Sequence, residues 1–192
     1  MDTIIKTEKS FLNTYSFIKH DELINNCLKE ANDLLIVNPS IIVYGKPGIQ
    51  HRDIGFFSNI SIGYNYSGQF AKSIPLTKSL SILIEIINEL FNTHYNGILI
   101  NKYKNGNDYI GAHSDDEKNL DSEGVIAISI GAVRKFRIRD KKTKKIIIDI
   151  PTISNNIIHM GGDFQKEFTH EIPIEKKIKE ERFSFTFRKH NK

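Results

Sequence analysis

The chain has 192 residues, of which 39% are hydrophobic and 26% are charged, with a formal net charge of +4. This length and composition favour one soluble globular domain and exclude a disordered chain. The single cysteine, Cys27, excludes an intramolecular disulfide and a cysteine-based zinc site and favours a reducing intracellular compartment, and no apolar run is long enough to span a bilayer.

The N-terminal part of the chain predicts two amphipathic helices separated by short strands. Residues 1–19 predict an irregular or extended start, and apolar residues at helical spacing predict a helix over 20–33. Residues 40–48 and 60–68 predict strands that end in glycine-containing turns. The clearest helix is expected over 77–94, with Thr77 or Ser79 as its N-cap.

After residue 96 the pattern changes to short alternating segments separated by turn residues. Eight such segments in under a hundred residues are typical of a β-sandwich or a jelly roll. The predicted strands lie in "GILINKY", "YIGAHSD", "VIAISIG", "RKFRIRD", "KKIIIDI", "NIIHMGGD", "EFTHEIPI" and "RFSFTFR".

The stretch "GAHSDDEKNL" places His113 and Asp115 two residues apart, so that on a strand both side chains would leave the same face. The pair is found in a polar loop as readily as in a metal site, so a third ligand is needed. Of the downstream histidines, His170 fits best, since His159 lies in an apolar run and His190 lies near the terminus. Two histidines and one carboxylate are the ligand set of non-haem Fe(II) oxygenases, although they can also bind zinc.

The segment "RFSFTFR" places Arg182, Ser184, Thr186 and Arg188 on one face of a strand and three phenylalanines on the other. An edge strand with a basic solvent face would show the same pattern. An iron oxygenase that uses 2-oxoglutarate, however, needs a buried cation for the distal carboxylate of that cosubstrate. Arginine suits this task because its planar fork meets a carboxylate with two hydrogen bonds.

These motifs together resemble the AlkB-type Fe(II)/2-oxoglutarate dioxygenases, which demethylate alkylated nucleobases. The resemblance runs from about residue 44 to residue 188 and is carried by "LINKYKNGNDYIGAHSDDE", "ISIGAVRKFRIR" and "RFSFTFRK". "VYGKPG", "GYNYSG" and "MGGDFQKEFTHEIP" are most similar to the animal nucleic-acid repair members. The resemblance implies an α+β fold, a double-stranded β-helix (jelly roll) core with N-terminal supporting helices. It implies one domain over 1–192, with a scaffold extension over 1–40, a nucleotide-recognition lid over 41–75 and the catalytic core over 96–190.

The resemblance also implies roles for individual residues. Fe(II), 2-oxoglutarate and O2 would be the cofactor and cosubstrates, and His113, Asp115 and His170 would bind the iron. The 2-oxoglutarate site would comprise Asn101, Tyr103, Arg182, Thr186 and Arg188. The substrate base would lie against Tyr64, Tyr66, Asp116 and Glu117. Nucleic-acid contacts would come from Tyr44, Lys46, Lys141, Lys142, Lys144 and Lys145.

The predicted function is oxidative demethylation of bases of the 1-methyladenine and 3-methylcytosine type in DNA or RNA, by a monomer. The basic segment over 141–145 is shorter than the loop of the duplex-acting members, which leaves single strands open as substrates. Three alternatives stay open: a dioxygenase that acts on protein side chains or modified tRNA, a catalytically dead nucleic-acid-binding module, and a zinc hydrolase. The pattern does not distinguish the nucleus from the cytoplasm.

Overall fold

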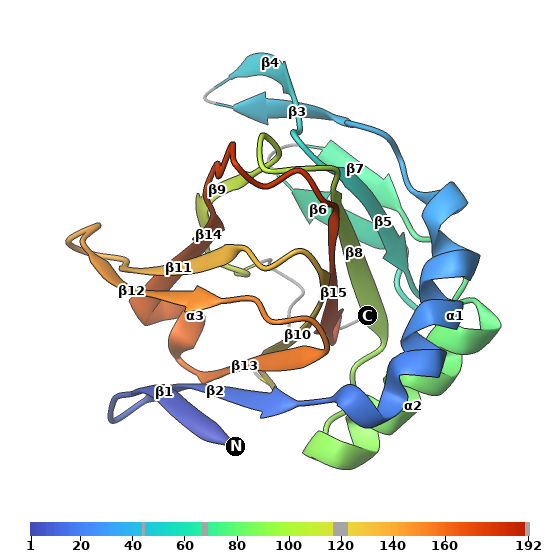
Figure 1. Cartoon of the computed structure of the whole chain (residues 1–192), viewed down its shortest axis with the longest axis horizontal. Coiled ribbons are helices and arrows are strands. Elements are labelled where there is room, and N and C mark those ends of the chain that lie inside the picture. Colours follow the sequence, from blue (N-terminus) through green and yellow to red (C-terminus); the bar gives the residue numbers. More distant parts are fainter. Residues whose placement is uncertain (44, 67–68, 117–122, 191–192) are drawn as a thin grey trace.

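The computed structural model describes residues 1–43, 45–66, 69–116 and 123–190. Two antiparallel sheets curve toward each other and enclose the interior of a barrel (Figure 1). The seven-stranded major sheet has the order β1-β2-β13-β10-β15-β8-β5, and the four-stranded minor sheet has the order β12-β11-β14-β9. This arrangement confirms the predicted jelly-roll architecture.

The major sheet consists of β1 (Asp2–Lys6), β2 (Ser10–Ser16), β5 (Asp53–Phe57), β8 (Gly97–Tyr103), β10 (Val125–Gly131), β13 (Asn156–Gly162) and β15 (Arg182–Arg188). The minor sheet consists of β9 (Ile110–His113), β11 (Lys135–Asp140), β12 (Ile146–Pro151) and β14 (Phe168–Ile172). The short helix α3 (Phe164–Glu167) directly precedes β14. The major sheet therefore also takes strands from the predicted scaffold extension, β1 and β2, and from the predicted lid segment, β5.

Two helices, α1 (Asp21–Ala31) and α2 (Lys78–Phe91), cover the outer face of the major sheet, as expected from their apolar stripes (Figure 1). The Thr77 side chain accepts a hydrogen bond from the backbone N–H of Leu80 at 3.3 Å, which confirms Thr77 as the N-cap. Leu80, Leu83 and Ile87 are fully buried, and each contributes about 1.5–3 kcal/mol of hydrophobic free energy. Two short 3-10 helices, η1 (Ile18–His20) and η2 (Asn32–Leu34), flank α1.

Two hairpins stand apart from the barrel sheets. The strands β3 (Ser40–Val43) and β4 (Lys46–Ile49) pair with each other, as do β6 (Gly63–Tyr66) and β7 (Gln69–Lys72). The sequence predicted a single strand at each place. In the first hairpin the chain reverses within the predicted strand, at Gly45, whose φ of +74° is a left-handed conformation that favours glycine. In the second hairpin β6 lies within the predicted segment 60–68, and the sequence did not predict its partner β7.

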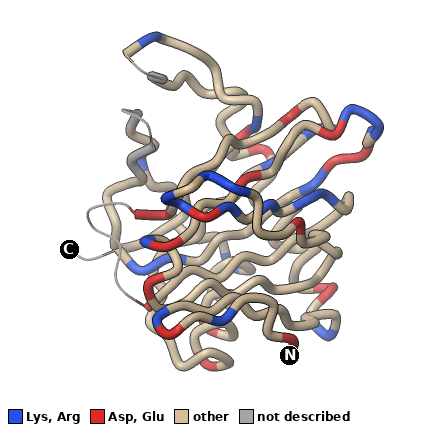
Figure 2. The backbone as a smooth tube through the Cα atoms, turned by 90° about the vertical axis from the view of Figure 1, so that its left-hand side faces the viewer, with Lys and Arg blue, Asp and Glu red and all other residues tan. Residues whose placement is uncertain are grey.

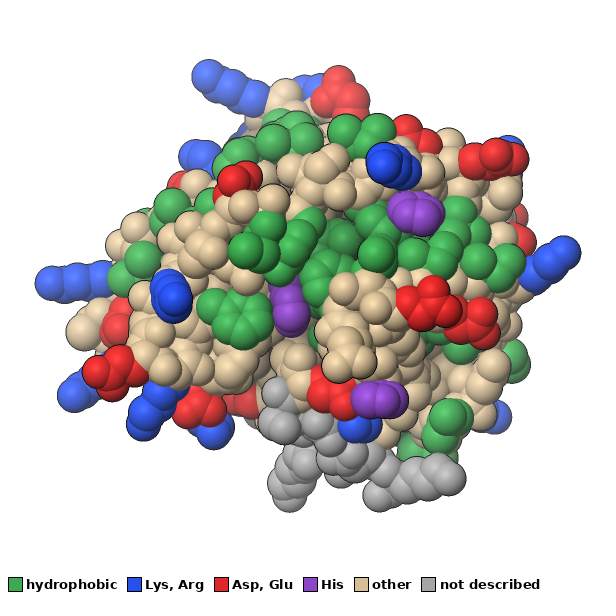
Figure 3. Space-filling view, turned by 90° about the horizontal axis from the view of Figure 1, so that it is seen from below, with side chains coloured by type: hydrophobic (Ala, Val, Ile, Leu, Met, Phe, Trp, Pro, Cys, Tyr) green, Lys and Arg blue, Asp and Glu red, His purple; other side chains and the backbone are tan. Residues whose placement is uncertain are grey.

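The outer face of β2 and β13 carries an aromatic cluster next to α2. The His159 ring makes edge-to-face contacts with Phe11 and Phe91, at centroid distances of 5.0 and 5.3 Å. Figure 3, the view from below, shows hydrophobic side chains gathered in the middle of this face. Among the described residues, no helix combines the length and the apolar character needed to cross a lipid bilayer.

Candidate active site

The proposed iron ligands converge at one end of the barrel. His113 ends β9 and is the register partner of His170 in β14, and Asp115 follows two residues after His113. Their candidate ligand atoms all lie within 4.8 Å of one another. Because β9 ends at His113, the carboxylate reaches the site from the loop and not from the shared strand face that the sequence suggested.

Hydrogen bonding prepares this group for a metal. Nδ1 of His113 lies 2.9 Å from the carbonyl oxygen of Gly111, which can only accept, so Nδ1 carries the proton and Nε2 is left as the ligand atom. Nε2 of His113 and Nε2 of His170 lie 3.8 and 3.5 Å from the Asp115 carboxylate oxygens. The three side chains therefore fit a divalent cation.

The charges at this end also suit a metal. Burial raises the pKa of the Asp115 carboxyl, but the Arg188 guanidinium at 2.7 Å and the two imidazoles outweigh burial and bring that pKa to about 2. Burial lowers the pKa of His113, and burial together with the neighbouring His113 lowers the pKa of His170 to about 3. At neutral pH the site holds one carboxylate and two neutral imidazoles, the protonation states in which these groups bind metals.

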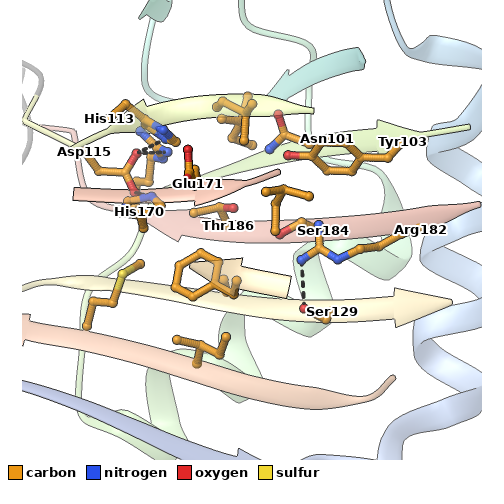
Figure 4. A pocket seen from close by; sticks show the side chains of 18 of the residues that line it. Asn101, Tyr103, His113, Asp115, Ser129, His170, Glu171, Arg182, Ser184 and Thr186 are labelled. Atoms are coloured by element: carbon orange, nitrogen blue, oxygen red, sulfur yellow. Dashed lines mark hydrogen bonds and ion pairs between the residues drawn. The ribbon is translucent and has the colours of Figure 1, made fainter. Parts of the chain in front are cut away.

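A cavity leads from these three residues along the inside of the barrel to Arg182 (Figure 4). Its empty volume, including the open mouth, is about 540 Å³. Along β15 the side chains of Arg182, Ser184, Thr186 and Arg188 line it, while the intervening phenylalanines lie in the core under the helices. The predicted division of "RFSFTFR" into two faces is therefore confirmed. Asn101 and Tyr103 line the cavity from β8, opposite Ser184 and Arg182.

Arg182 is a buried cation that lacks a carboxylate partner among the described residues. It is 3% exposed, and it donates to Thr152 Oγ1 at 3.2 Å and to Ser129 Oγ at 2.9 Å. Its Nη1 has no hydrogen-bond partner in the described part of the chain. Burial lowers the pKa of Arg182 to about 10, so the group is still charged at neutral pH. A buried charge that is hydrogen-bonded but unpaired fits the carboxylate of a ligand.

Several residues around the cavity were not predicted. Ser129 and Thr152 hold the Arg182 guanidinium, and Arg52, which is 3% exposed, donates to Asn101 Oδ1 at 2.8 Å. A serine among the apolar residues of "VIAISIG" is the signal that could have identified Ser129. Arg52 and Thr152 lie in segments whose pattern predicts nothing about their partners.

The residues predicted to contact the base lie in different environments. Tyr64 is 3% exposed, lines the cavity and packs its ring 4.9 Å from the Arg188 guanidinium. Asp116 is exposed and forms an ion pair with Lys141 at 3.1 Å. Tyr66 belongs to β6, while Glu117 lies outside the described residues.

The predicted nucleic-acid contacts are on the surface. Lys46 is exposed at the start of β4, and Lys142, Lys144 and Lys145 are exposed at the turn between β11 and β12. Tyr44 lies outside the described residues. Basic and acidic segments are interspersed over the side of the molecule that carries the minor sheet (Figure 2). Along the described backbone on this side, lysine and arginine therefore alternate with aspartate and glutamate.

Comparison with known proteins agrees with this geometry. Residues 17–188 match the model of the 2OG-Fe(II) oxygenase superfamily. The human DNA oxidative demethylase ALKBH2 is 27% identical over 177 residues, which cover 88% of this chain and 68% of the relative. The human alpha-ketoglutarate-dependent dioxygenase alkB homolog 3 is 34% identical over 123 residues, which cover 59% of this chain and 42% of the relative.

The chain thus spans about two thirds of the length of its mammalian ALKBH2 relatives, with 64% for the bovine and 65% for the mouse protein, and 56% of the Arabidopsis protein. The solved structure of OsALKBH1 superimposes with a TM-score of 0.61 and 17% sequence identity, over 98% of this chain and 100% of that chain. This likeness supports the same fold.

Proposed function

The chain belongs to the 2OG-Fe(II) oxygenase superfamily, and we propose that it is an oxidative demethylase of N-alkylated nucleobases in DNA or RNA. The observation that carries the proposal is a single cavity with a metal-ligand triad at one end and an unpaired buried arginine at the other. The names of the ALKBH2 and alkB homolog 3 relatives support the substrate class.

The residues that line the cavity have separate proposed roles in binding iron, binding 2-oxoglutarate and excluding water. Bound Fe(II), 2-oxoglutarate and O2 supply the oxidation, which yields succinate and carbon dioxide and releases the methyl carbon as formaldehyde. His113, Asp115 and His170 would hold the iron, and Arg182 would bind the distal carboxylate of 2-oxoglutarate. The protein's task is to position these groups and to exclude water, which the buried apolar walls, including Leu99, Ile158 and Met160, help to do.

The proposed substrates are bases such as 1-methyladenine and 3-methylcytosine. A base inside a duplex cannot reach the buried metal site, so it must leave the stack, and a lesion that blocks pairing is cheaper to extrude. Such bases are cationic and suit a nearby carboxylate. Asp116, which pairs with Lys141, and Glu117, which lies outside the described residues, are the proposed carboxylates.

The proposal includes a monomeric enzyme, because the residues proposed to bind iron and 2-oxoglutarate lie together in one barrel. Size-exclusion chromatography with light scattering tests this point. A dimer in this measurement would contradict the proposed monomer. The proposed reaction would be unaffected if activity stayed the same at dilutions where the dimer dissociates.

The test of function is release of formaldehyde from three oligonucleotides that each carry one 1-methyladenine: single-stranded DNA, duplex DNA and RNA. Fe(II), ascorbate and 2-oxoglutarate are supplied. Asp115→Ala should abolish release. Asp149→Ala, which removes a carboxylate paired with Arg137 on the other face of the minor sheet, should retain it. The ranking of the three substrates identifies the strand type.

Two negative results have different meanings. Succinate formation without formaldehyde from any oligonucleotide would reject the nucleic-acid substrate and leave a dioxygenase of other specificity, such as one that acts on proteins. No succinate with any substrate, from a protein that binds Fe(II) and 2-oxoglutarate, would indicate a catalytically inactive binding module.

A further inference from the structure

The segment that carries the metal-binding carboxylate lies beyond the end of its strand. Pairing between β9 and β14 runs through Ile110↔Ile172 to His113↔His170 and then stops. Ser114, Asp115 and Asp116 therefore have no sheet partners for their backbone groups, although Asp115 is buried. Something other than strand pairing must hold Asp115 in the site.

Side chains replace the missing strand pairing. The Ser114 hydroxyl donates to the carbonyl oxygen of Phe168 at 2.9 Å. The backbone N–H of Asp115 donates to the side-chain oxygen of Gln165 at 2.9 Å. A buried backbone N–H requires such a partner, and Gln165 provides it from α3, five residues before the ligand His170.

Lys141 closes the same arrangement from the minor sheet. Its ammonium donates to the backbone carbonyl of Gln165 at 2.9 Å and to the Asp116 carboxylate at 3.1 Å. Lys141 thus links α3, which carries Gln165, to Asp116, the residue that follows the proposed ligand Asp115. The side chains of Lys141 and Asp116 are 34% and 65% exposed, so this link is weaker than the buried one through Gln165.

We propose that Gln165 is a positioning residue of the metal centre, which fixes the Asp115 backbone so that its carboxylate faces the two imidazoles, and that Lys141 holds Gln165 in place. Outer residues that orient metal ligands change metal affinity by about 10- to 100-fold when they are removed. The inference rests on the metal site and is independent of the nucleic-acid substrate.

The test measures the affinity of the metal-free protein for Co(II), by titration followed through the absorption of the bound ion. Gln165→Leu keeps the size of the side chain and removes the acceptor, so its Kd for Co(II) should rise about tenfold or more. Lys166→Met is the matched control, because Lys166 is the next residue in α3 and pairs only with Asp163 among the described residues, at 2.8 Å. Its Kd should equal that of the unmodified protein.

Lys141→Met provides a second variant that leaves the core intact. Its Kd should rise by about two- to fivefold, as expected for an exposed ion pair. When Lys141→Met is combined with Gln165→Leu, the Co(II) Kd should rise little further, because Lys141 acts on the Asp115 backbone through Gln165. Melting of the metal-free variants separates positioning from folding. An unchanged Co(II) Kd in Gln165→Leu, with or without a lower melting temperature, would overturn the proposal. If that variant does not fold, an unchanged Kd in Lys141→Met overturns it instead.

Discussion

The interior of the barrel and the two hairpins beside it are built in different ways. Inside the barrel, Asp115 and Arg182 are each 3% exposed and hydrogen-bonded to side chains on other strands or loops. The hairpins β3–β4 and β6–β7 form separate two-stranded sheets, and they expose large apolar residues, with Ile49 at 63% and Phe70 at 51%. A two-stranded hairpin has little stability of its own, whereas the major sheet packs against the helices on one face and lines the barrel interior with the other.

This difference assigns separate tasks to the two regions. The buried groups are held in one geometry, as cofactor chemistry requires, while exposed apolar hairpins can adapt to a large partner. Substitutions inside the barrel should therefore change the affinity for metal or 2-oxoglutarate. Substitutions on the surface near the cavity, apart from Lys141, which holds Gln165, should change only the affinity for nucleic acid. A hairpin substitution that weakened the binding of metal or 2-oxoglutarate would contradict this assignment.

The largest effect is expected for Arg182→Lys. Lysine keeps the charge but loses the planar fork, and a hydrogen bond to a charged group contributes about 1.5–3 kcal/mol. The affinity of the Co(II)-loaded protein for 2-oxoglutarate, measured by calorimetry, should fall about 10- to 100-fold, while the Co(II) affinity stays unchanged. Arg137→Lys, which is paired with Asp149 on the other face of the minor sheet, is the control and should match the unmodified protein. Equal losses of Co(II) and 2-oxoglutarate affinity would contradict a separate anion site.

A smaller effect is expected from pH, through the buried imidazole of His170 and the half-buried imidazole of His159. Burial lowers the pKa of His170 to about 3 and that of His159 to about 4, from an unfolded value near 6.5. As the pH falls below about 6.5, the unfolded chain binds protons that the folded chain does not, so the metal-free protein loses stability until each folded pKa is reached.

Urea unfolding between pH 7 and pH 4.5 measures this loss. His159→Phe should reduce the dependence by at most about 1.4 kcal/mol per pH unit, because it removes one titrating group from an aromatic cluster and breaks no hydrogen bond of its Nδ1 among the described residues. His51→Ala, which removes an exposed imidazole that stacks on Tyr109, is the control. If the unfolding free energy depends on pH equally in His159→Phe and in the unmodified protein, the pKa of His159 is not lowered by folding.

The sequence predicted those parts of the barrel that depend on local periodicity. Alternation in "RFSFTFR" predicted which side chains face the cavity, and helical spacing with a Thr77 cap predicted α2. The sequence also predicted that His170 lies close to His113 and Asp115, and the two histidines are register partners across β9 and β14.

Contacts between distant segments could not be predicted in this way. Lys141 and Asp116 are 25 residues apart, and each alone is typical of a solvated surface, yet they pair. Gln165 lies in a single helical turn that periodicity cannot detect. His190 was ranked below His170 because it lies near the terminus, but it is buried and held by Asn96 and Ser61, because the chain after β15 packs back against the barrel. These features depend on how the sheets close, which no short pattern encodes.

The smallest effect is expected at the basic turn between β11 and β12. Lys142, Lys144 and Lys145 are exposed, whereas Lys141 is occupied by Asp116 and Gln165, so the phosphate contacts are assigned to the first three. Changing these three to alanine should weaken binding to all oligonucleotides alike. Each lost phosphate contact should reduce the slope of log K against log salt by about 0.7–0.9, and the affinity for 2-oxoglutarate should not change.

The control for that variant removes the same charge elsewhere. Changing Lys19, Lys29 and Lys78 on and beside the two helices also lowers the formal net charge from +4 to +1. These residues lie on the far side of the major sheet from the cavity, so their loss should leave the salt slope nearly unchanged. Equal slopes for the two triple variants would mean that net charge alone attracts the nucleic acid. A changed slope in the β11–β12 variant alone would place a phosphate backbone at this turn, next to Lys141, which holds Gln165 beside the metal site.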